Sequence, residues 1–277
     1  MDRKIMKKIA REILPPFIHE TFRKLICRGK NIYNPTWHTV RDGNLKGRQI
    51  FIDSENAPWQ KEMLEGKFDH VIFDYLKTID LKGKVVFEIG AQIGYHAMNF
   101  ACLVGESGAV YAFEPNIFNL DRMNLILTKN QDLRERIRIF NFAVSDNRGE
   151  VEFYLTPDVD KGTSSGSFIE SADTYYARSH AYLELFERVK VKTVSLDDIS
   201  SIGIAAVPDI IKIDVEGAES SVLLGGVNLL KKHKPLLFIE IHSIYNMLKA
   251  YEILSSVRYN IELIREEADG RCFIAAN

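Results

Sequence analysis

The sequence has little of the chemistry that stabilises secreted domains or anchors a chain in a bilayer. Its 277 residues include only three cysteines, Cys27, Cys102 and Cys272, which form neither a CxxC pair nor a Cys/His metal spacing. The longest apolar runs, such as residues 235–241, are too short to span a membrane. The basic N-terminus lacks the continuous apolar core and the cleavage site of a signal peptide. We therefore expect reduced thiols, a cytoplasmic location and no transmembrane helix.

A strong charge of one sign is also absent. The 36 Lys and Arg residues nearly balance the 38 Asp and Glu residues, which leaves a formal net charge of −2 and no overall basic field that could hold nucleic acid. An Asn-Pro-Pro-aromatic element, which would favour methylation of nucleic acid, is missing as well. Hydrophobic residues make up 46% of the chain, enough to bury the core of one sizeable domain. We expect no nucleic-acid partner.

Charge is distributed unevenly along the chain. The first 30 residues carry a net charge of +6, so the rest of the chain is at −8. Apolar residues such as Ile5, Ile9 and Ile13 follow helical spacing up to Pro15-Pro16, which predicts two short amphipathic helices. These helices would either pack on the domain or lie against an anionic membrane surface, and the sequence leaves both readings open. We assign residues 1–66 to a helical and irregular N-terminal extension.

From residue 67 onward, apolar strands and helical stretches alternate. The strands are expected at residues 85–89, 110–113, 137–144, 151–155, 210–214 and 236–241, with a terminal pair near 259–265 and 272–275. The helices are expected at residues 95–104, 117–128, 220–232 and 245–255. Such alternation predicts an α/β fold with a mostly parallel sheet, helices on both faces, and a ligand site beyond the carboxyl ends of the strands. The long polar stretch Thr156–His180 predicts a lid-like insertion at about residues 156–190.

The first polar constellation follows the strand at 85–89. Glu88 stands at the end of this strand, and Gly90 and Gly94 frame a turn into the next helix. Glycine lets a backbone turn sharply and approach a ligand closely. Ala91 and Gln92 stand between the glycines, so the spacing departs from the dinucleotide fingerprint GxGxxG. Binding of a pyrophosphate is therefore weakly supported.

The second constellation is the acid at the end of the next strand. Glu114 lies twenty residues after Gly94 and is followed by Pro115. An acid at this place can accept both hydroxyls of a ribose, in nicotinamide enzymes and in adenosylmethionine enzymes alike. Alternatively, Glu88 and Glu114 could simply complement the N-terminal dipoles of the helices that follow.

The third constellation spans two later strands. Strand alternation places Lys212, Asp214 and Glu216 on one side near a carboxyl end, and Glu240 and His242 together at the next one. Buried charges are costly unless they are paired or bound, so a purely structural network is the more expensive reading. We expect these five groups to converge where the ligand binds.

Six segments in order resemble one family, the FkbM-type S-adenosylmethionine-dependent methyltransferases, over about residues 84–242. They read EIGAQIGYHA, AFEP, NFAVSDNRGEVEFY, VSLDDI, IIKIDVEGAESSVLLGG and LLFIEIH. The resemblance implies a Rossmann-like class I methyltransferase domain at residues 67–277, with a mostly parallel sheet and a C-terminal antiparallel strand. It also implies S-adenosylmethionine as cofactor and O-methylation of a hydroxyl, often on a sugar or polyketide. Glu88 replaces the usual Asp of the family, and Gln92 an Asn that is frequent there.

These observations give a set of candidate site residues. The cofactor is expected to contact Glu88, Gly90, Ala91, Gln92, Gly94, Glu114, Pro115, Asn116, Ala143 and Asp214. The turn at Gly90–Gly94 would hold the methionine part, Glu114 the ribose, and the segment Phe142–Val144 the adenine. Three tyrosines of the insertion, Tyr175, Tyr176 and Tyr182, would contact a small-molecule or glycan acceptor by stacking on it.

For catalysis, we expect His242 to act as general base, with Asp214, Glu216 and Glu240 positioning it or the acceptor. A divalent metal held by these four residues is a competing possibility that we do not predict. Two other functions stay open at this point: a nicotinamide-dependent oxidoreductase on the same fold, and a catalytically silent nucleotide-binding scaffold.

Overall fold

The computed structural model describes residues 34–55, 57–156, 166–173, 183, 186–201, 206–267 and 270–277. Residues 34–277 form one compact unit. The amphipathic helices predicted before residue 31 and the three tyrosines Tyr175, Tyr176 and Tyr182 lie outside the described residues. Within the described part of the chain, every helix is too short or too polar to cross a bilayer.

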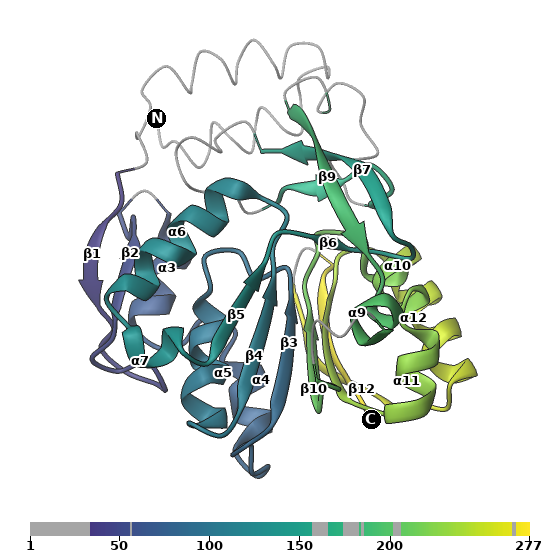
Figure 1. The fold of residues 1–277 in the computed structure, drawn as a ribbon, viewed down its shortest axis with the longest axis horizontal. Helices are drawn as coiled ribbons and strands as arrows, with labels where there is room; N and C mark the ends of the chain where they lie inside the picture. The colour runs from purple at the N-terminus through teal and green to yellow at the C-terminus, as the bar shows by residue number, and fades with distance from the viewer. Residues whose placement is uncertain are drawn as a thin grey trace, which may run out of the picture. The chain divides into compact units, whose positions relative to one another are not determined.

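The central sheet has seven strands in the order β12-β13-β11-β10-β3-β4-β5 (Figure 1). Five of them run parallel: β3 (Val85–Ile89), β4 (Ala109–Phe113), β5 (Ile137–Phe140), β10 (Ile210–Ile213) and β11 (Leu236–Ile241). The last strand, β13 (Cys272–Ala276), runs antiparallel to both β11 and β12 (Ile261–Glu266). The predicted fold class is therefore confirmed. Strand order reverses between β3 and β10, the point where ligands bind in such sheets.

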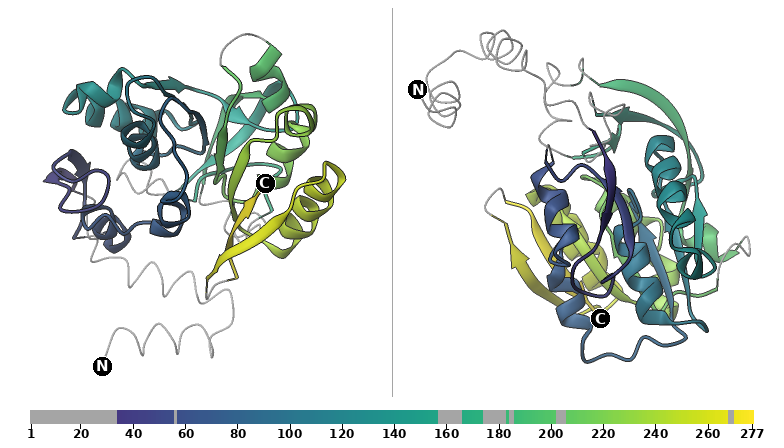
Figure 2. Two further views of the ribbon diagram at one scale, coloured as in Figure 1. Left: turned by 90° about the horizontal axis from the view of Figure 1, so that it is seen from below. Right: turned by 90° about the vertical axis from the view of Figure 1, so that its left-hand side faces the viewer.

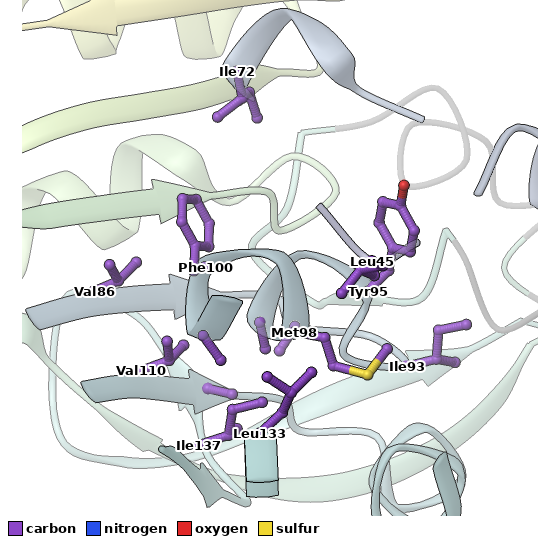
Figure 3. Packing of buried hydrophobic residues seen from close by; sticks show 14 of the residues in the cluster. Leu45, Ile72, Val86, Ile93, Tyr95, Met98, Phe100, Val110, Leu133 and Ile137 are labelled. Atoms are coloured by element: carbon purple, nitrogen blue, oxygen red, sulfur yellow. The ribbon is translucent and has the colours of Figure 1, made fainter. Parts of the chain in front are cut away.

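One face of the sheet is covered by helices from the first half of the chain. These are α4 (His70–Leu76), α5 (Tyr95–Val104), α6 (Ile117–Thr128) and α7 (Gln131–Arg134). The strands present Val86, Val110 and Ile137 to this face, where they pack with Phe100 and Leu133 (Figure 3). Side chains alternate along a strand, so the neighbouring residues of β3 and β4 face the opposite side.

The other face is covered by helices from the second half, as the two views in Figure 2 show. They are α9 (Leu196–Ser201), α10 (Glu219–Leu224), α11 (Val227–His233) and α12 (Ile244–Ser256). The single helix predicted at 220–232 is wrong, because the chain breaks at Gly225 and Gly226. A Cβ atom on Gly225 would lie 2.1 Å from the carbonyl oxygen of Ser145, and one on Gly226 would lie 2.7 Å from Leu196. Gly225 therefore allows a close approach of the backbone at Ser145, and Gly226 allows close packing of the Leu196 side chain.

A second sheet of four strands, in the order β6-β9-β7-β8, is inserted after β5. Its strands are β6 (Ala143–Val144), β7 (Gly149–Leu155), β8 (Phe168–Ile169) and β9 (Glu187–Val194). The strand predicted at 137–144 is thus two strands in different sheets. They separate where the Asn141 amide donates hydrogen bonds to the carbonyl oxygens of Glu114 and Pro115. The insertion predicted at about 156–190 contains β8 and the start of β9, so its described part includes regular structure.

Residues 34–66 add β1 (Thr36–Thr39), β2 (Gln49–Ile52) and α3 (Pro58–Leu64). The first two strands form an antiparallel pair. Ile50, Ile52 and Met63 are fully buried and belong to the same hydrophobic core as α5 and the strands β3 and β4. These residues, which the sequence analysis assigned to an extension, thus pack as part of the compact unit.

Candidate functional site

A cavity of about 350 Å³ opens beyond the carboxyl ends of β3, β4, β10 and β11, where the strand order reverses. Residues that follow each of these strands line it, and the inserted sheet contributes Phe153 and Ile169. This is the position that the α/β topology predicts for a ligand.

The glycine turn after β3 is shaped by close packing. Gly90 has a φ of +83°, and a Cβ atom there would lie 1.8 Å from the carbonyl oxygen of Asp214. The backbone N–H groups of Gly90 and Ala91 both donate hydrogen bonds to the carbonyl oxygen of Phe113, each at 3.0 Å. The next N–H, that of Gln92, donates to the Glu114 carboxylate at 2.7 Å. Because these donors are used internally, the turn offers a shaped surface and little anion-binding capacity.

Glu114 is almost completely buried and holds this turn in place. Besides Gln92, its carboxylate accepts hydrogen bonds from the Asn116 N–H at 2.9 Å and the Asn119 amide at 3.2 Å. Burial raises the pKa of Glu114 above its ordinary value although these donors oppose the shift. A carboxylate accepts about four hydrogen bonds in all. Glu114 therefore retains capacity for about one further donor at the cavity that it lines.

Most of the predicted cofactor residues line the cavity. They are Gly90, Ala91, Gln92, Glu114, Pro115, Ala143 and Asp214. Three predicted residues do not line it, and their positions give the reason. Gly94 faces Met123 of α6, Asn116 caps α6 by accepting from the Phe118 N–H at 3.0 Å, and Glu88 lies buried beneath the cavity.

The predicted catalytic residues converge around His242. Its Nε2 atom lies 3.5 Å from Glu216, 3.8 Å from Asp214 and 3.8 Å from Glu240, measured to the carboxylate oxygens. Lys212 reaches Asp214 with its Nζ atom at 3.0 Å. The strand pattern thus correctly predicted that these five groups meet at one place.

The sequence analysis did not count Glu219 among the site residues. This carboxylate is fully buried, and its Oε1 atom lies 2.8 Å from the Nδ1 atom of His242. The same oxygen accepts the Gly217 N–H at 2.8 Å. Glu219 begins α10, so its place two residues after the glycine of the segment DVEGAE was the available signal. It fixes the orientation of the imidazole and turns Nε2 toward the other carboxylates.

Burial and mutual charge shift the pKa values in this cluster. Burial lowers the pKa of His242, but the carboxylates of Glu216, Glu219 and Asp214 outweigh this and hold it well above its ordinary value. Burial and the nearby Asp214 charge raise the pKa of Glu240 to about 8. Burial alone would raise the pKa of Asp214, but the positive charges of Lys212 and His242 bring it below its usual range. These carboxylates therefore favour the protonated imidazole.

A second buried ionic layer, also absent from the prediction, supports the cluster. The Asp69 carboxylate lies 3.3 Å from Nε2 of His96 and 3.0 Å from the guanidinium of Arg265. Both carboxyl oxygens of Glu88 lack a hydrogen bond within the described ranges. Burial raises the pKa of Glu88 to about 8, against the opposing charge of Lys212. Glu88 therefore keeps its proton through most of the neutral range.

The described part of the predicted lid contacts the same site. The Gly166 N–H donates to Glu216 at 2.8 Å, and the Asp173 N–H donates to the Gly217 carbonyl oxygen at 2.8 Å. The Ser243 hydroxyl donates to the Asp173 carboxylate at 2.7 Å. The insertion is thereby attached to the loops that follow β10 and β11.

Comparison with known proteins gives consistent matches to methyltransferases. The hexuronic acid methyltransferase AglP of Haloferax volcanii is 27% identical over 79% of this chain and 80% of its own length. The 2-O-methyltransferase NoeI of Sinorhizobium fredii is 29% identical over 53% of this chain and 59% of its own length. The crystal structure of methyltransferase FkbM from Methylobacillus flagellatus KT superposes with a TM-score of 0.48 at 22% identity, over 70% of this chain and 43% of that one. Residues 88–261 match the methyltransferase FkbM domain, and the chain therefore belongs to this family.

Proposed function

We propose that this methyltransferase transfers a methyl group from S-adenosylmethionine to a hydroxyl of a sugar or glycan. The observation that carries the proposal is the joining, in one cavity, of Glu114 after β4 with His242 and its carboxylates after β11. Membership of the family supports methyl transfer, and two relatives are named for methylation of a hexuronic acid and of a 2-hydroxyl.

In this proposal the cofactor occupies the side of the cavity formed after β3, β4 and β5. The cofactor supplies a methyl group that is already activated as a sulfonium. The turn at Gly90 holds its methionine part, the remaining acceptor capacity of Glu114 receives a ribose hydroxyl, and the segment Phe142–Val144 borders the adenine. The structure adds one refinement, since Glu114 has room for about one further strong hydrogen bond where the sequence suggested two.

The acceptor then lies beside Asp214, Glu240 and His242. Alignment of its oxygen with the methyl group is the chief contribution of the protein, and removal of the hydroxyl proton is the second. Glu219 holds Nδ1 of His242, so Nε2 is the atom that exchanges a proton with the acceptor. Because the pKa of His242 is well above its ordinary value, the base form becomes more abundant as pH rises. A cationic ligand in the cavity would lower this pKa through like-charge repulsion.

A divalent metal is the competing reading of the same residues. Donor atoms of Asp214, Glu240 and His242 lie within 4.8 Å of one another, a set that suits Mg²⁺ or Mn²⁺. However, both carboxylates already have cationic partners, Lys212 at 3.0 Å and Arg271 at 2.7 Å. We therefore favour proton transfer. Activity that survives EDTA supports this choice, whereas loss of activity that Mg²⁺ restores would assign the residues to a metal.

The proposed function is tested by incubating the protein with S-adenosylmethionine and a panel of methyl pyranosides, neutral and uronic, followed by mass spectrometry. We expect one acceptor class to gain a single methyl group, and the His242→Gln variant to lose this activity while still binding S-adenosylhomocysteine. Equal methylation by the variant would remove the catalytic assignment. The peripheral membrane contact and the tyrosine lid rest on residues outside the described part and stay predictions.

A further inference from the structure

Two aromatic side chains in the cavity wall come from outside the segment that matches the family. Trp59 of α3 and Phe68, in the loop before α4, line the cavity, whereas the family match begins at residue 88. We propose that they form a platform that binds the apolar face of the acceptor's pyranose ring and so determine which acceptor is used. This inference rests on the proposed function and deepens it.

The rings form a connected wall. The ring centroids of Trp59 and Phe68 are 5.7 Å apart, with the ring planes tilted by 43°. Phe68 in turn meets Tyr95 edge to face at 5.7 Å. Trp59 and Phe68 are only partly buried, and Tyr95, which also lines the cavity, is 3% exposed. The partial exposure of the first two rings therefore includes surface that faces the cavity.

The backbone on both sides of Phe68 is fixed. Gly66 has a φ of +67°, and a Cβ atom there would lie 2.4 Å from the carbonyl oxygen of Asp42. On the other side, Asp69 adopts a φ of +46°, an uncommon conformation for a residue other than glycine. The buried contacts of its carboxylate with His96 and Arg265 stabilise this conformation. Phe68 is thus held in a preset position, as expected for a binding group.

The chemistry of the wall fits a sugar ring. A pyranose has flat patches of C–H groups and a rim of hydroxyls. Aromatic faces can cover the patches of C–H groups. Asp214, Glu240 and His242, which line the same cavity, can form hydrogen bonds with the hydroxyls. A wholly apolar acceptor would cover the atoms of these polar groups that face the cavity without offering them a hydrogen bond, which is costly. The combination therefore favours a carbohydrate.

The sequence provides a direct reporter, because its only two tryptophans are Trp37 and Trp59. Trp37 lies on β1 beside Phe51 and is not part of the cavity wall. In the Trp37→Phe variant, all indole fluorescence comes from Trp59. We would saturate this variant with S-adenosylhomocysteine and titrate it with methyl glucoside, methyl galactoside, methyl mannoside and methyl glucuronide. A saturable change in emission with at least one of these sugars is expected.

Two failures are distinguishable in this experiment. If calorimetry shows no binding of S-adenosylhomocysteine, the proposed function fails. If the cofactor product binds and none of the four sugars changes the emission of Trp59, the platform is overturned and the proposed function stands.

Kinetics supply the second test, with the acceptor on which the chain is active. Trp59→Leu is expected to raise the KM for the acceptor about tenfold, as the loss of one aromatic contact implies, with kcat and the KM for S-adenosylmethionine nearly unchanged. Trp59→Phe should restore most of the affinity, and Trp37→Leu is the matched control without effect. If Trp59→Leu does not fold, Phe68→Leu replaces it. An unchanged acceptor KM in a folded variant, or an equal loss of cofactor affinity, contradicts the platform.

Discussion

The two halves of the cavity are built on different principles. Around Glu114, hydrogen bonds of 2.7 to 3.2 Å satisfy the turn and the carboxylate, and the residues there are held by shape and backbone geometry. Around His242, charged groups face one another at 2.8 to 3.8 Å, and the pKa values of Asp214 and His242 are displaced in opposite directions. The first half therefore suits a ligand whose position must be fixed, and the second half suits a group whose proton must move.

The two halves meet where the backbones after β3 and β10 pack together. Gly90 belongs to the turn after β3, and it packs directly on the carbonyl oxygen of Asp214 after β10. Variants of each half should therefore have separate effects, and a change at Gly90 should affect both.

The largest effect is expected from Gly90→Ala. The new Cβ atom would lie 1.8 Å from the Asp214 carbonyl oxygen in a residue with a φ of +83°, so the two strand ends must separate. We expect a loss of about 3 kcal/mol or more in the free energy of unfolding, together with loss of cofactor binding. Urea denaturation and calorimetry measure the two quantities.

Gly47→Ala is the matched control. Gly47 has a φ of +85°, yet nothing lies within 4 Å of a Cβ atom there. The free energy of unfolding should therefore fall by only about 1 kcal/mol, which is the cost of the left-handed backbone conformation for alanine. Equal losses in the two variants would show that the contact with Asp214 does not join the halves.

His242→Gln should separate the halves most clearly in activity. Loss of a general base lowers kcat by about 100-fold to 10,000-fold. Because the contacts of His242 are with carboxylates of its own half of the cavity, the affinity for S-adenosylhomocysteine should stay near that of the wild type. Steady-state kinetics and calorimetry on the same preparation measure the two quantities. A parallel loss of kcat and of affinity for S-adenosylhomocysteine would contradict the separation of the two halves.

Glu219→Gln should shift the pH profile. The Glu219 carboxylate raises the pKa of His242 through a hydrogen bond and its charge, so its removal lowers that pKa. The rising limb of kcat against pH should move to lower pH by about one unit. If the rising limb of kcat against pH does not move, a group other than His242 determines it.

Glu88→Gln should change the pH dependence of stability. Burial raises the pKa of folded Glu88 from 4.5 to about 8, so the native state holds a proton that the unfolded chain has released. This contribution to stability is complete below pH 4.5 and is lost as pH rises toward 8. Relative to the variant, the wild type should lose up to about 1.4 kcal/mol per pH unit in this window. Urea unfolding of both proteins at several pH values measures this difference. If the free energies of unfolding of the wild type and the variant change with pH in the same way, the raised pKa of Glu88 is contradicted.

Much of this architecture could be predicted from local sequence. The strands at 85–89 and 236–241 and the helices at 95–104 and 117–128 were predicted correctly from their apolar patterns. The convergence of Asp214 and His242 followed from strand alternation. In these cases, neighbouring residues alone determine the structure.

The errors arose where distant residues decide. Asp69 pairs with Arg265 across 196 positions, and no local pattern indicates such a partner. The chain leaves the main sheet at Asn141 because its amide bonds to the loop after β4. The sequence analysis did not single out Trp59 and Phe68, and only the folded chain shows that they line the cavity.

The most direct test of the central claim is the affinity of folded Glu114→Ala for S-adenosylhomocysteine, measured by calorimetry beside the wild type and the exposed-site control Glu135→Ala. The lost ribose contact and the loosened turn should cost about 2 kcal/mol, which raises the dissociation constant about 30-fold. The control should bind as the wild type does, because Glu135 is exposed and lies outside the cavity wall. An unchanged dissociation constant for Glu114→Ala would contradict the assignment of this half of the cavity to the cofactor.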